Sequence, residues 1–286
     1  MRFVQFKTRA SPKRVNFGVQ VENEGEIVPL EDLGANNLIE FLDLEDGMIK
    51  AKSVIDNKSK PRLSPNEVTL LAPVTSPDKV ICIGMNYKDH CEEQNAPVPT
   101  EPVVFNKFPS CIIGPSDPIP FPDLTQELDW EVELAIVIGK IGRNISESNA
   151  MNHVLGYTVA HDVSARDWQL RKNGGQWLLG KAMDGFCPLG PAIVTKDELP
   201  NVHELGIRCL VNGVTKQEST TAQLVFKTEA IVAWVSRFCT LRPGDVILTG
   251  TPPGVGVFMK PPQFLQRGDT VVCEIDGIGK ITNQIQ

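Results

Sequence analysis

The sequence predicts an α+β fold in which strands dominate, and three observations lead to this prediction. Short apolar or alternating runs recur along most of the chain, which is typical of strands. The 286 residues include 23 glycines and 22 prolines, as expected where many turns join short strands. Amphipathic helical patterns are few. We expect the main strands near residues 103–105, 132–138, 154–163, 208–211, 246–249 and 271–275.

Residues 1–72 are expected to form a small N-terminal β-rich unit, and residues 73–286 the main domain. Prolines 61, 65, 73 and 77 mark a plausible linker over 61–79. Within the small unit we expect a strand over 3–6, a hairpin over 17–30 that turns at Asn23–Gly25, and a short helix over 37–42.

Turn and capping signals divide the main unit further. Asn212-Gly213 and Asp276-Gly277 are dipeptides that favour tight hairpin turns. Thr228 is expected to cap a helix, and Ser164 a second helix that begins at Ala165. The apolar face of the first helix is predicted to contain Ile231, Trp234, Val235 and Phe238.

Composition excludes several classes of protein. The chain is 41% hydrophobic and 22% charged, with a formal charge of -7, so nucleic acid and anionic membranes are not expected as main partners. Seven cysteines without a CxxC pair favour neither a disulfide framework nor a thiolate zinc site, and indicate reduced thiols. No apolar stretch approaches the ~20 residues of a membrane span. The first 14 residues contain no apolar signal core, and they do not demonstrate a transit peptide.

The segment LDWEVELAIVIGK, residues 128–140, suggests a metal site. Alternate side chains of a strand share a face, so Glu131 and Glu133 would lie roughly 6–7 Å apart on one side. Their face continues with apolar residues, and a cation between the carboxylates best explains such a pair. The alternative is the solvent-facing edge of an ordinary strand.

A second candidate is GYTVAHDVSARDWQ, residues 156–169. Asp162 ends an apolar run and is placed to complete an oxygen-only metal site, although it could instead cap the following helix. Arg166 and Gln169 share a helical face and could bind a substrate carboxylate; a surface pair is the alternative. His161 should point away from Asp162, as a packed or hydrogen-bonded side chain.

Three further segments carry candidate residues. In GMNYKDHCEEQN, His90 and Glu93 are three residues apart, and a carboxylate on imidazole makes a general base; such a spacing also arises by chance. Lys181 lies among apolar and glycine residues, where it could bind an enolate or transfer a proton, or extend to the surface. Thr251 and backbone N–H groups of GDVILTGTPPGVG, residues 244–256, could line a carboxylate site.

Taken together, GMNYKDH, WEVEL, HDVSARD, LGK and GDVILTGTPPGVG resemble the motifs of the fumarylacetoacetase family over roughly residues 70–286. The resemblance implies a mixed β-roll fold, usually a homodimer, and one magnesium ion, sometimes calcium or manganese. In the family the ion is bound by the two glutamates of ExE and a later aspartate, which match Glu131, Glu133 and Asp162. An all-oxygen ligand set favours a hard cation over zinc.

The resemblance also implies roles for six other residues. The family's His–Glu dyad matches His90 and Glu93, and its active-site lysine matches Lys181. Its substrate-contacting arginine and glutamine match Arg166 and Gln169, and its loop threonine matches Thr251.

The family spans C–C hydrolases, decarboxylases and isomerases, so the fold does not decide the reaction. The nearest subgroup resembles mitochondrial oxaloacetate tautomerases, which convert enol-oxaloacetate to the keto form. We therefore expect a small oxo-acid substrate and a mitochondrial location, with the cytoplasm as the alternative. The runner-up is a C–C hydrolase of acylpyruvates or similar β-diketo acids, and a third hypothesis is a metal-binding member without catalysis. An acidic ligand found upstream in the founding hydrolase has no match here, so its substrate is not carried over.

Overall fold

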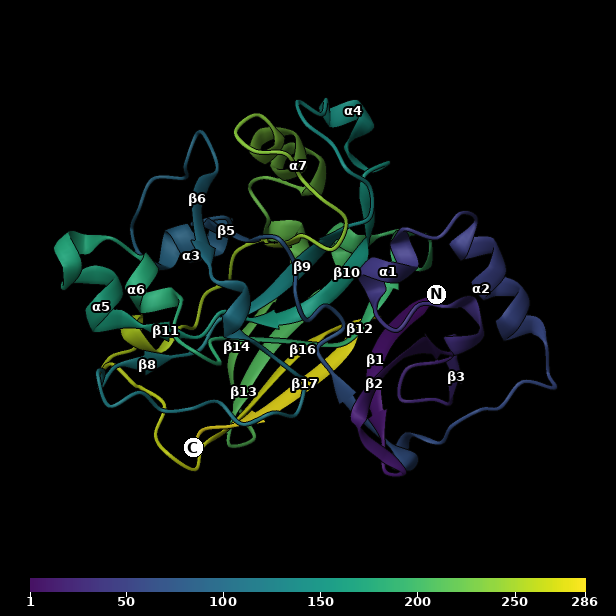
Figure 1. The fold of residues 1–286 in the computed structure, drawn as a ribbon. Coiled ribbons are helices and arrows are strands. Elements are labelled where there is room, and N and C mark those ends of the chain that lie inside the picture. Colours follow the sequence, from purple (N-terminus) through teal and green to yellow (C-terminus); the bar gives the residue numbers. More distant parts are fainter.

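The computed structural model describes residues 1–286 and contains a large mixed sheet of eleven strands (Figure 1). Most of it follows the order β3-β2-β1-β12-β10-β9-β15-β5-β6, with β4 beside β1 and β7 beside β12. The bounds are β1 Arg2–Thr8, β2 Ser11–Gln20, β3 Ile27–Pro29, β4 Val68–Leu71, β5 Val80–Gly84, β6 Val103–Lys107, β7 Ile112–Ile113, β9 Val132–Ile138, β10 Val154–His161, β12 Cys187–Thr195 and β15 Val246–Leu248.

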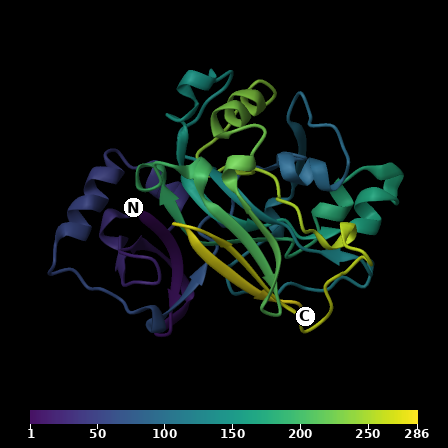
Figure 2. The same ribbon diagram turned by 180° about the vertical axis from the view of Figure 1, so that it is seen from behind.

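A four-stranded antiparallel sheet packs against the large one, and Figure 2 shows it from the side opposite to Figure 1. Its strands are β13 Gly206–Val211, β14 Val214–Thr220, β16 Thr270–Ile275 and β17 Gly279–Gln284. Alternate residues of β13 and β16 are buried, whereas every residue of β9, β10 and β12 is buried. The core therefore lies around the central strands of the large sheet.

The helices are short and lie around the sheets. Helices α3, α5 and α6 gather at one side of the molecule, while α1 and α2 lie with the N-terminal strands at the other (Figure 1). None of the helices has the length and apolar character needed to span a lipid bilayer. The bounds are α1 Leu38–Leu42, α2 Gly47–Asp56, α3 Lys88–Glu93, α4 Glu147–Ala150, α5 Arg166–Leu170, α6 Leu178–Lys181 and α7 Thr228–Ser236.

The β-dominated α+β fold class is confirmed, as are the predicted hairpins. Strands β13 and β14 turn at Asn212-Gly213, where both residues have positive φ, and β16 and β17 turn at 276–278. Strands β2 and β3 pair as expected over 17–30. The short helix near 37–42 is α1, and the side chain of Asn37 caps it by accepting the N–H of Glu40.

Two predicted helix caps are wrong. Helix α7 has Lys227 at its cap, and Thr228 is its first residue, with a hydroxyl that accepts a hydrogen bond from Tyr157. Ser164 lies in the two-residue strand β11, which pairs with β8 (Leu128–Asp129), and its hydroxyl donates to the carbonyl of Asp162. The pairing of β11 with β8 and the contact with Tyr157 therefore keep Ser164 and Thr228 from acting as helix caps.

The helix that follows Ser164, α5, begins at Arg166 and not at Ala165. Helix α7 ends at Ser236, so Phe238 lies beyond it and is 67% exposed, contrary to the predicted apolar face.

The N-terminal strands continue the main sheet. Strand β1 pairs with β2 on one side and with β12 on the other, and β4, within the expected linker, also pairs with β1. Phe3, Phe17 and Phe41 stack together between these strands and α1. The division into residues 1–72 and 73–286 stays a prediction.

Candidate functional site

One end of the central strands brings the candidate residues together. Strand β10 ends, and β9 begins, at this end because the two are antiparallel; β5 and β15, which are parallel, both end there. A narrow pocket of about 70 Å³ opens at this point. Seven of the predicted residues line it, namely His90, Glu131, Glu133, Arg166, Gln169, Lys181 and Thr251.

The three predicted metal ligands form a buried acid cluster. Glu131 directly precedes β9, Glu133 is its second residue, and Asp162 directly follows β10. The backbone N–H of Asp162 donates to the carbonyl of Glu131 at 2.9 Å, which fixes the two chain segments side by side. One carboxylate oxygen from each residue lies within 4.8 Å of the others.

Glu131 and Glu133 have opposite electrostatic environments. Burial raises the pKa of the Glu131 carboxyl, but the ammonium of Lys181 at 2.8 Å and the guanidinium of Arg166 at 2.7 Å outweigh it and lower the pKa to about 2. Burial, followed by the charges of Asp162 and Glu131, raises the pKa of Glu133 well above its usual value. Glu133 is therefore the carboxyl that needs either a proton or a further cation.

The cluster fits a hard divalent cation. Asp162 is held by the ammonium groups of Lys107 at 2.7 Å and Lys181 at 2.9 Å. Including the neighbouring Asp129, the buried carboxyls outnumber the buried cationic side chains of this region by one charge. An all-oxygen donor set with an excess negative charge suits magnesium, calcium or manganese better than zinc.

Arg166 is held by three acceptors and keeps one spare donor. Its Nε donates to Asp129 at 2.8 Å, and its Nη1 donates to Gln169 at 2.9 Å and lies 2.7 Å from Glu131. Burial lowers the pKa of Arg166, but the charges of Asp129 and Glu131 together have the larger effect and raise it above its usual value. The guanidinium therefore stays charged. Its Nη2 is buried without a hydrogen-bond partner, which makes it a donor for an anionic ligand.

His90 and Glu93 pair as the spacing predicted. The Nδ1 of His90, on helix α3, lies 2.8 Å from Oε2 of Glu93. The other oxygen of Glu93 accepts the backbone N–H of Gly254 at 2.9 Å. His90 is 7% exposed and its ring lies 6.0 Å from the ring of Phe258, so the imidazole sits at the wall of the pocket.

The loop after β15 connects the parts of the site through its backbone. Gly250 donates to Glu133 at 2.7 Å and Gly254 to Glu93, while Gly256 and Val257 donate to Asp129 at 2.7 and 3.0 Å. A Cβ atom on Gly254 would lie 2.0 Å from the carbonyl oxygen of Lys216, and one on Gly256 would lie 2.0 Å from that of Gln263. Only glycine therefore fits at these two positions of the loop.

Thr251 lies in this loop, but its hydroxyl is already used. It donates to the carbonyl of Val132 at 3.0 Å and accepts from the amide of Gln217 at 2.8 Å. Gln217 in turn accepts the N–H of Val132 at 2.9 Å. Contact between Thr251 and a substrate stays a prediction.

Sequence reasoning missed Lys107 and Asp129. Lys107 is fully buried and donates to the carbonyls of Val163 and Lys181 besides pairing with Asp162. The feature that pointed to Lys181, a lysine within an apolar segment, is also present at Lys107. Asp129 follows Leu128 directly before the ExE segment, where no pattern showed that a third carboxylate would bind Arg166 and the loop.

His161 is a packed, fully buried side chain, as expected, and does not line the pocket. Both ring nitrogens are buried without a hydrogen-bond partner. Burial, and secondarily the nearby charge of Lys107, lowers the pKa of His161 to about 3, so the ring is neutral.

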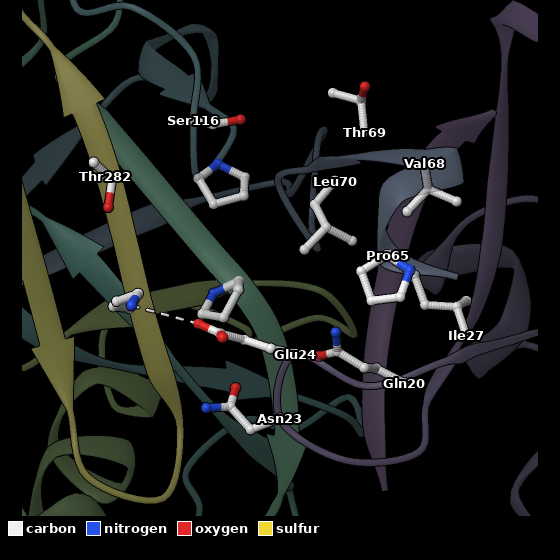
Figure 3. A pocket seen from close by; sticks show the side chains of 13 residues that line it. Gln20, Asn23, Glu24, Ile27, Pro65, Val68, Thr69, Leu70, Ser116 and Thr282 are labelled. Carbon is white, nitrogen blue, oxygen red and sulfur yellow. Dashed lines mark ion pairs between the residues drawn. The ribbon is translucent and has the colours of Figure 1, made fainter. Parts of the chain in front are cut away.

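A wider cavity of about 540 Å³ contains none of the candidate residues. It lies between the N-terminal strands and β17, and Figure 3 shows its lining. Glu24 and Lys280 form an ion pair of 3.5 Å across it, with both side chains more than half exposed. The chemistry-bearing groups are therefore in the narrow pocket.

A β-dominated fold that joins a buried acid cluster, a spare guanidinium donor and a His–Glu pair defines a protein with a site that could hold a metal ion. The chain belongs to the fumarylacetoacetate hydrolase family: residues 79–286 match the model described as fumarylacetoacetate (FAA) hydrolase, C-terminal. Enzymes of this family depend on a metal.

Curated relatives match over the whole chain. It is 58% identical to mitochondrial oxaloacetate tautomerase fahd2 of Xenopus laevis, covering 100% of this chain and 90% of that protein. It is 54% identical to mitochondrial oxaloacetate tautomerase FAHD2A of Homo sapiens, covering 100% and 91%. The crystal structure of fumarylacetoacetate hydrolase from Exiguobacterium antarcticum superimposes with a TM-score of 0.86 at 40% identity, covering 100% of this chain and 99% of that one.

Proposed function

We propose that this chain is a magnesium-dependent oxaloacetate tautomerase, which converts enol-oxaloacetate to the keto form. The carrying observation is that Glu131 and Glu133 of the acid cluster, Arg166 with its spare Nη2, and His90 line one small pocket. The names of relatives more than half identical over the whole chain support the same reaction.

The pocket suits a compact anion. Its volume of about 70 Å³ leaves room only for a small substrate, and Trp177 and Phe258 are among its apolar walls. Arg166 presents its unpartnered Nη2 to a substrate carboxylate, while Asp129 and Gln169 fix the plane of the guanidinium.

Tautomerisation moves one proton from the enol oxygen and delivers one to the neighbouring carbon. His90, oriented by Glu93, is proposed to carry one of these transfers and Lys181 the other. Glu131, Glu133 and Asp162 would hold the metal, which as a Lewis acid stabilises negative charge on the substrate oxygens.

Magnesium is proposed because carboxylate oxygens are the donors that it prefers, with calcium or manganese as alternatives. A homodimer is proposed from the family resemblance, and the half-exposed apolar residues Val103, Val104 and Phe108 on and beside β6 are compatible with an interface. The names of the relatives support a mitochondrial location, with the cytoplasm as the alternative.

The second candidate is C–C bond hydrolysis of an acylpyruvate. Hydrolysis must activate a water, and an imidazole held by a carboxylate at 2.8 Å is the group that does so. The similar structure from Exiguobacterium antarcticum is itself named a hydrolase.

One spectrophotometric comparison tests both reactions. Loss of enol-oxaloacetate is followed beside acetylpyruvate hydrolysis, each with and without EDTA. We expect rapid, EDTA-sensitive loss of the enol and little hydrolysis. Rapid cleavage with enol loss at its spontaneous rate would assign the hydrolase function, and turnover of neither substrate would favour a metal-binding member without catalysis.

A further inference from the structure

The imidazole of His90 makes a hydrogen bond at each ring nitrogen. The Glu93 carboxylate, 2.8 Å from Nδ1, only accepts, so Nδ1 carries the hydrogen and Nε2 has the free lone pair. The amide nitrogen of Gln94 lies 2.8 Å from Nε2 and donates to it. Gln94 also lines the pocket. The lone pair that would accept a proton is thus already occupied.

We propose that Gln94 is a positioning residue that acts as a substrate-displaced latch on the base. In the substrate-free protein its amide occupies the Nε2 lone pair, and the reacting atom of the substrate must take its place. An imidazole lone pair lies in the ring plane and points in one direction, so one donor at 2.8 Å excludes another. The inference rests on the proposed function, because it assumes that His90 moves a proton of the substrate.

The two sides of the ring are held with unequal strength, as a latch requires. On the Nδ1 side, Glu93 is fixed by the N–H of Gly254 at 2.9 Å. On the Nε2 side, Gln94 is only partly buried and follows the last residue of α3. The other contacts of its amide nitrogen are longer, 3.3 Å to Sδ of Met85 and 3.4 Å to the carbonyl of His90. Rotation of Gln94 therefore breaks one good hydrogen bond and leaves the ring in place.

The cost of opening the latch should appear in substrate affinity. When only a fraction of the protein has the pocket open, the apparent affinity falls by that fraction. A net hydrogen bond of ordinary strength corresponds to a factor of about 2–10. Gln94→Ala should therefore lower KM for the enol by about 2–10-fold while kcat stays near that of the wild type. A residue with a merely structural role would give a raised KM or a lower kcat.

Two variants sharpen this expectation. Gln94→Glu places a carboxylate beside the ring, which binds the protonated imidazole and is not displaced by an anion, so KM should rise and the acid limb of the kcat/KM profile should move to higher pH. The titratable groups that share this space are Glu93, Glu131, Glu133, Arg166 and Lys181. Glu92→Ala, at an exposed position on the same helix, is the matched control and should leave KM unchanged.

Nitrogen NMR of histidine-labelled protein tests the latch without turnover. The chain has four histidines, and His90→Ala assigns the relevant signal. In Gln94→Ala the Nε2 resonance of His90 should move downfield, as expected when an unprotonated nitrogen loses its hydrogen bond. In magnesium-loaded wild type, malonate, an unreactive dicarboxylate, should displace the amide and therefore also shift this resonance.

The outcomes separate the latch from the proposed function. If the Nε2 resonance is the same in Gln94→Ala, or does not respond to malonate in the wild type, the latch is wrong. If the resonance moves but KM is unchanged or raised, the contact exists without acting as a latch, and the proposal also fails. If the wild type leaves the enol at its spontaneous rate, the proposed function fails, and the malonate titration still decides whether the amide is displaced.

Discussion

The two walls of the pocket are held in place by different means. The acid wall is formed by Glu131 and Glu133, next to Asp162; all three lie on or beside the ends of β9 and β10 and are almost fully buried. A second wall, the dyad wall, is formed by His90 of α3, a helix of six residues, and is supported by Glu93, which is partly exposed. Buried ammonium and guanidinium groups hold the first wall, whereas single hydrogen bonds hold the second.

The difference indicates what each wall can do. Charges in a buried environment interact strongly, and a strand end cannot move without breaking the sheet, so the acid wall is suited to fix an ion in one geometry. A short helix whose imidazole is bonded by a fixed carboxylate on one side and by a partly exposed amide on the other is suited to let a base exchange partners. Changes in the acid wall should therefore affect metal binding and activity together, and changes in the dyad wall should affect activity alone.

The largest effect is expected from Glu131→Ala and Asp162→Ala. Each removes a proposed metal ligand and leaves Lys181 without one of its two carboxylates. Activity should fall to background, and the magnesium-dependent gain in stability should disappear; that gain is about 2.7 kcal/mol at 100 times the dissociation constant. Thermal unfolding with and without magnesium, beside calorimetric titration, measures both. Unchanged magnesium binding in both variants would show that the ligand assignment is wrong.

His90→Ala tests whether the two walls act independently. The variant loses the proposed base, so kcat should fall by about 10²–10⁴-fold. The magnesium-dependent rise in melting temperature should stay, because His90 is not part of the acid cluster. Loss of that rise would mean that the two walls are not independent.

The acid wall illustrates what could be predicted from the sequence. The alternation of apolar residues around Glu131 and Glu133 predicted a strand with both carboxylates on one side, and the end of an apolar run placed Asp162 at a strand end. Both predictions depend on local periodicity, which one sequence contains. The burial of Lys107 against Asp162 joins residues 55 positions apart, and no local pattern encodes such a contact.

The dyad wall shows the complementary limit. A spacing of three residues predicted the contact between His90 and Glu93, but not the donor on the other oxygen of Glu93, because Gly254 lies 161 residues away. The caps predicted at Ser164 and Thr228 were wrong for a related reason. Ser164 pairs with β8 as part of the short strand β11, and the hydroxyl of Thr228 accepts from Tyr157, which is 71 residues away.

Arg166→Lys tests the group that lies between the walls and the substrate. Lysine keeps the charge but carries its donors on one nitrogen, which cannot occupy at once the positions where Nε meets Asp129, Nη1 meets Gln169 and Nη2 is free. KM should rise by about 10–100-fold, the range for losing a hydrogen bond to a charged group. Arg171→Lys, in an exposed pair with Glu127, is the control and should behave as wild type. Equal kinetic constants for both variants would make Arg166 a structural residue.

Glu93→Gln should have the smallest effect and is the most informative about the reaction. Glu93 accepts two hydrogen bonds, from His90 at 2.8 Å and from Gly254 at 2.9 Å, whereas a primary amide has only one oxygen. The amide of the variant can keep its hydrogen bond to the ring, but its nitrogen then faces the N–H of Gly254. The loss is therefore one ordinary hydrogen bond, and kcat should fall by about 2–10-fold, far less than in His90→Ala. A tautomerase tolerates this change because the base needs only to be placed, while activation of water depends on the carboxylate that stabilises the protonated ring.

Steady-state kinetics of enol loss and of acylpyruvate cleavage by Glu93→Gln, measured on one preparation, distinguish the two reactions. If Glu93→Gln lowers enol turnover as much as His90→Ala does, the negative charge of Glu93 is essential and the proton transfer proposed for His90 must be revised.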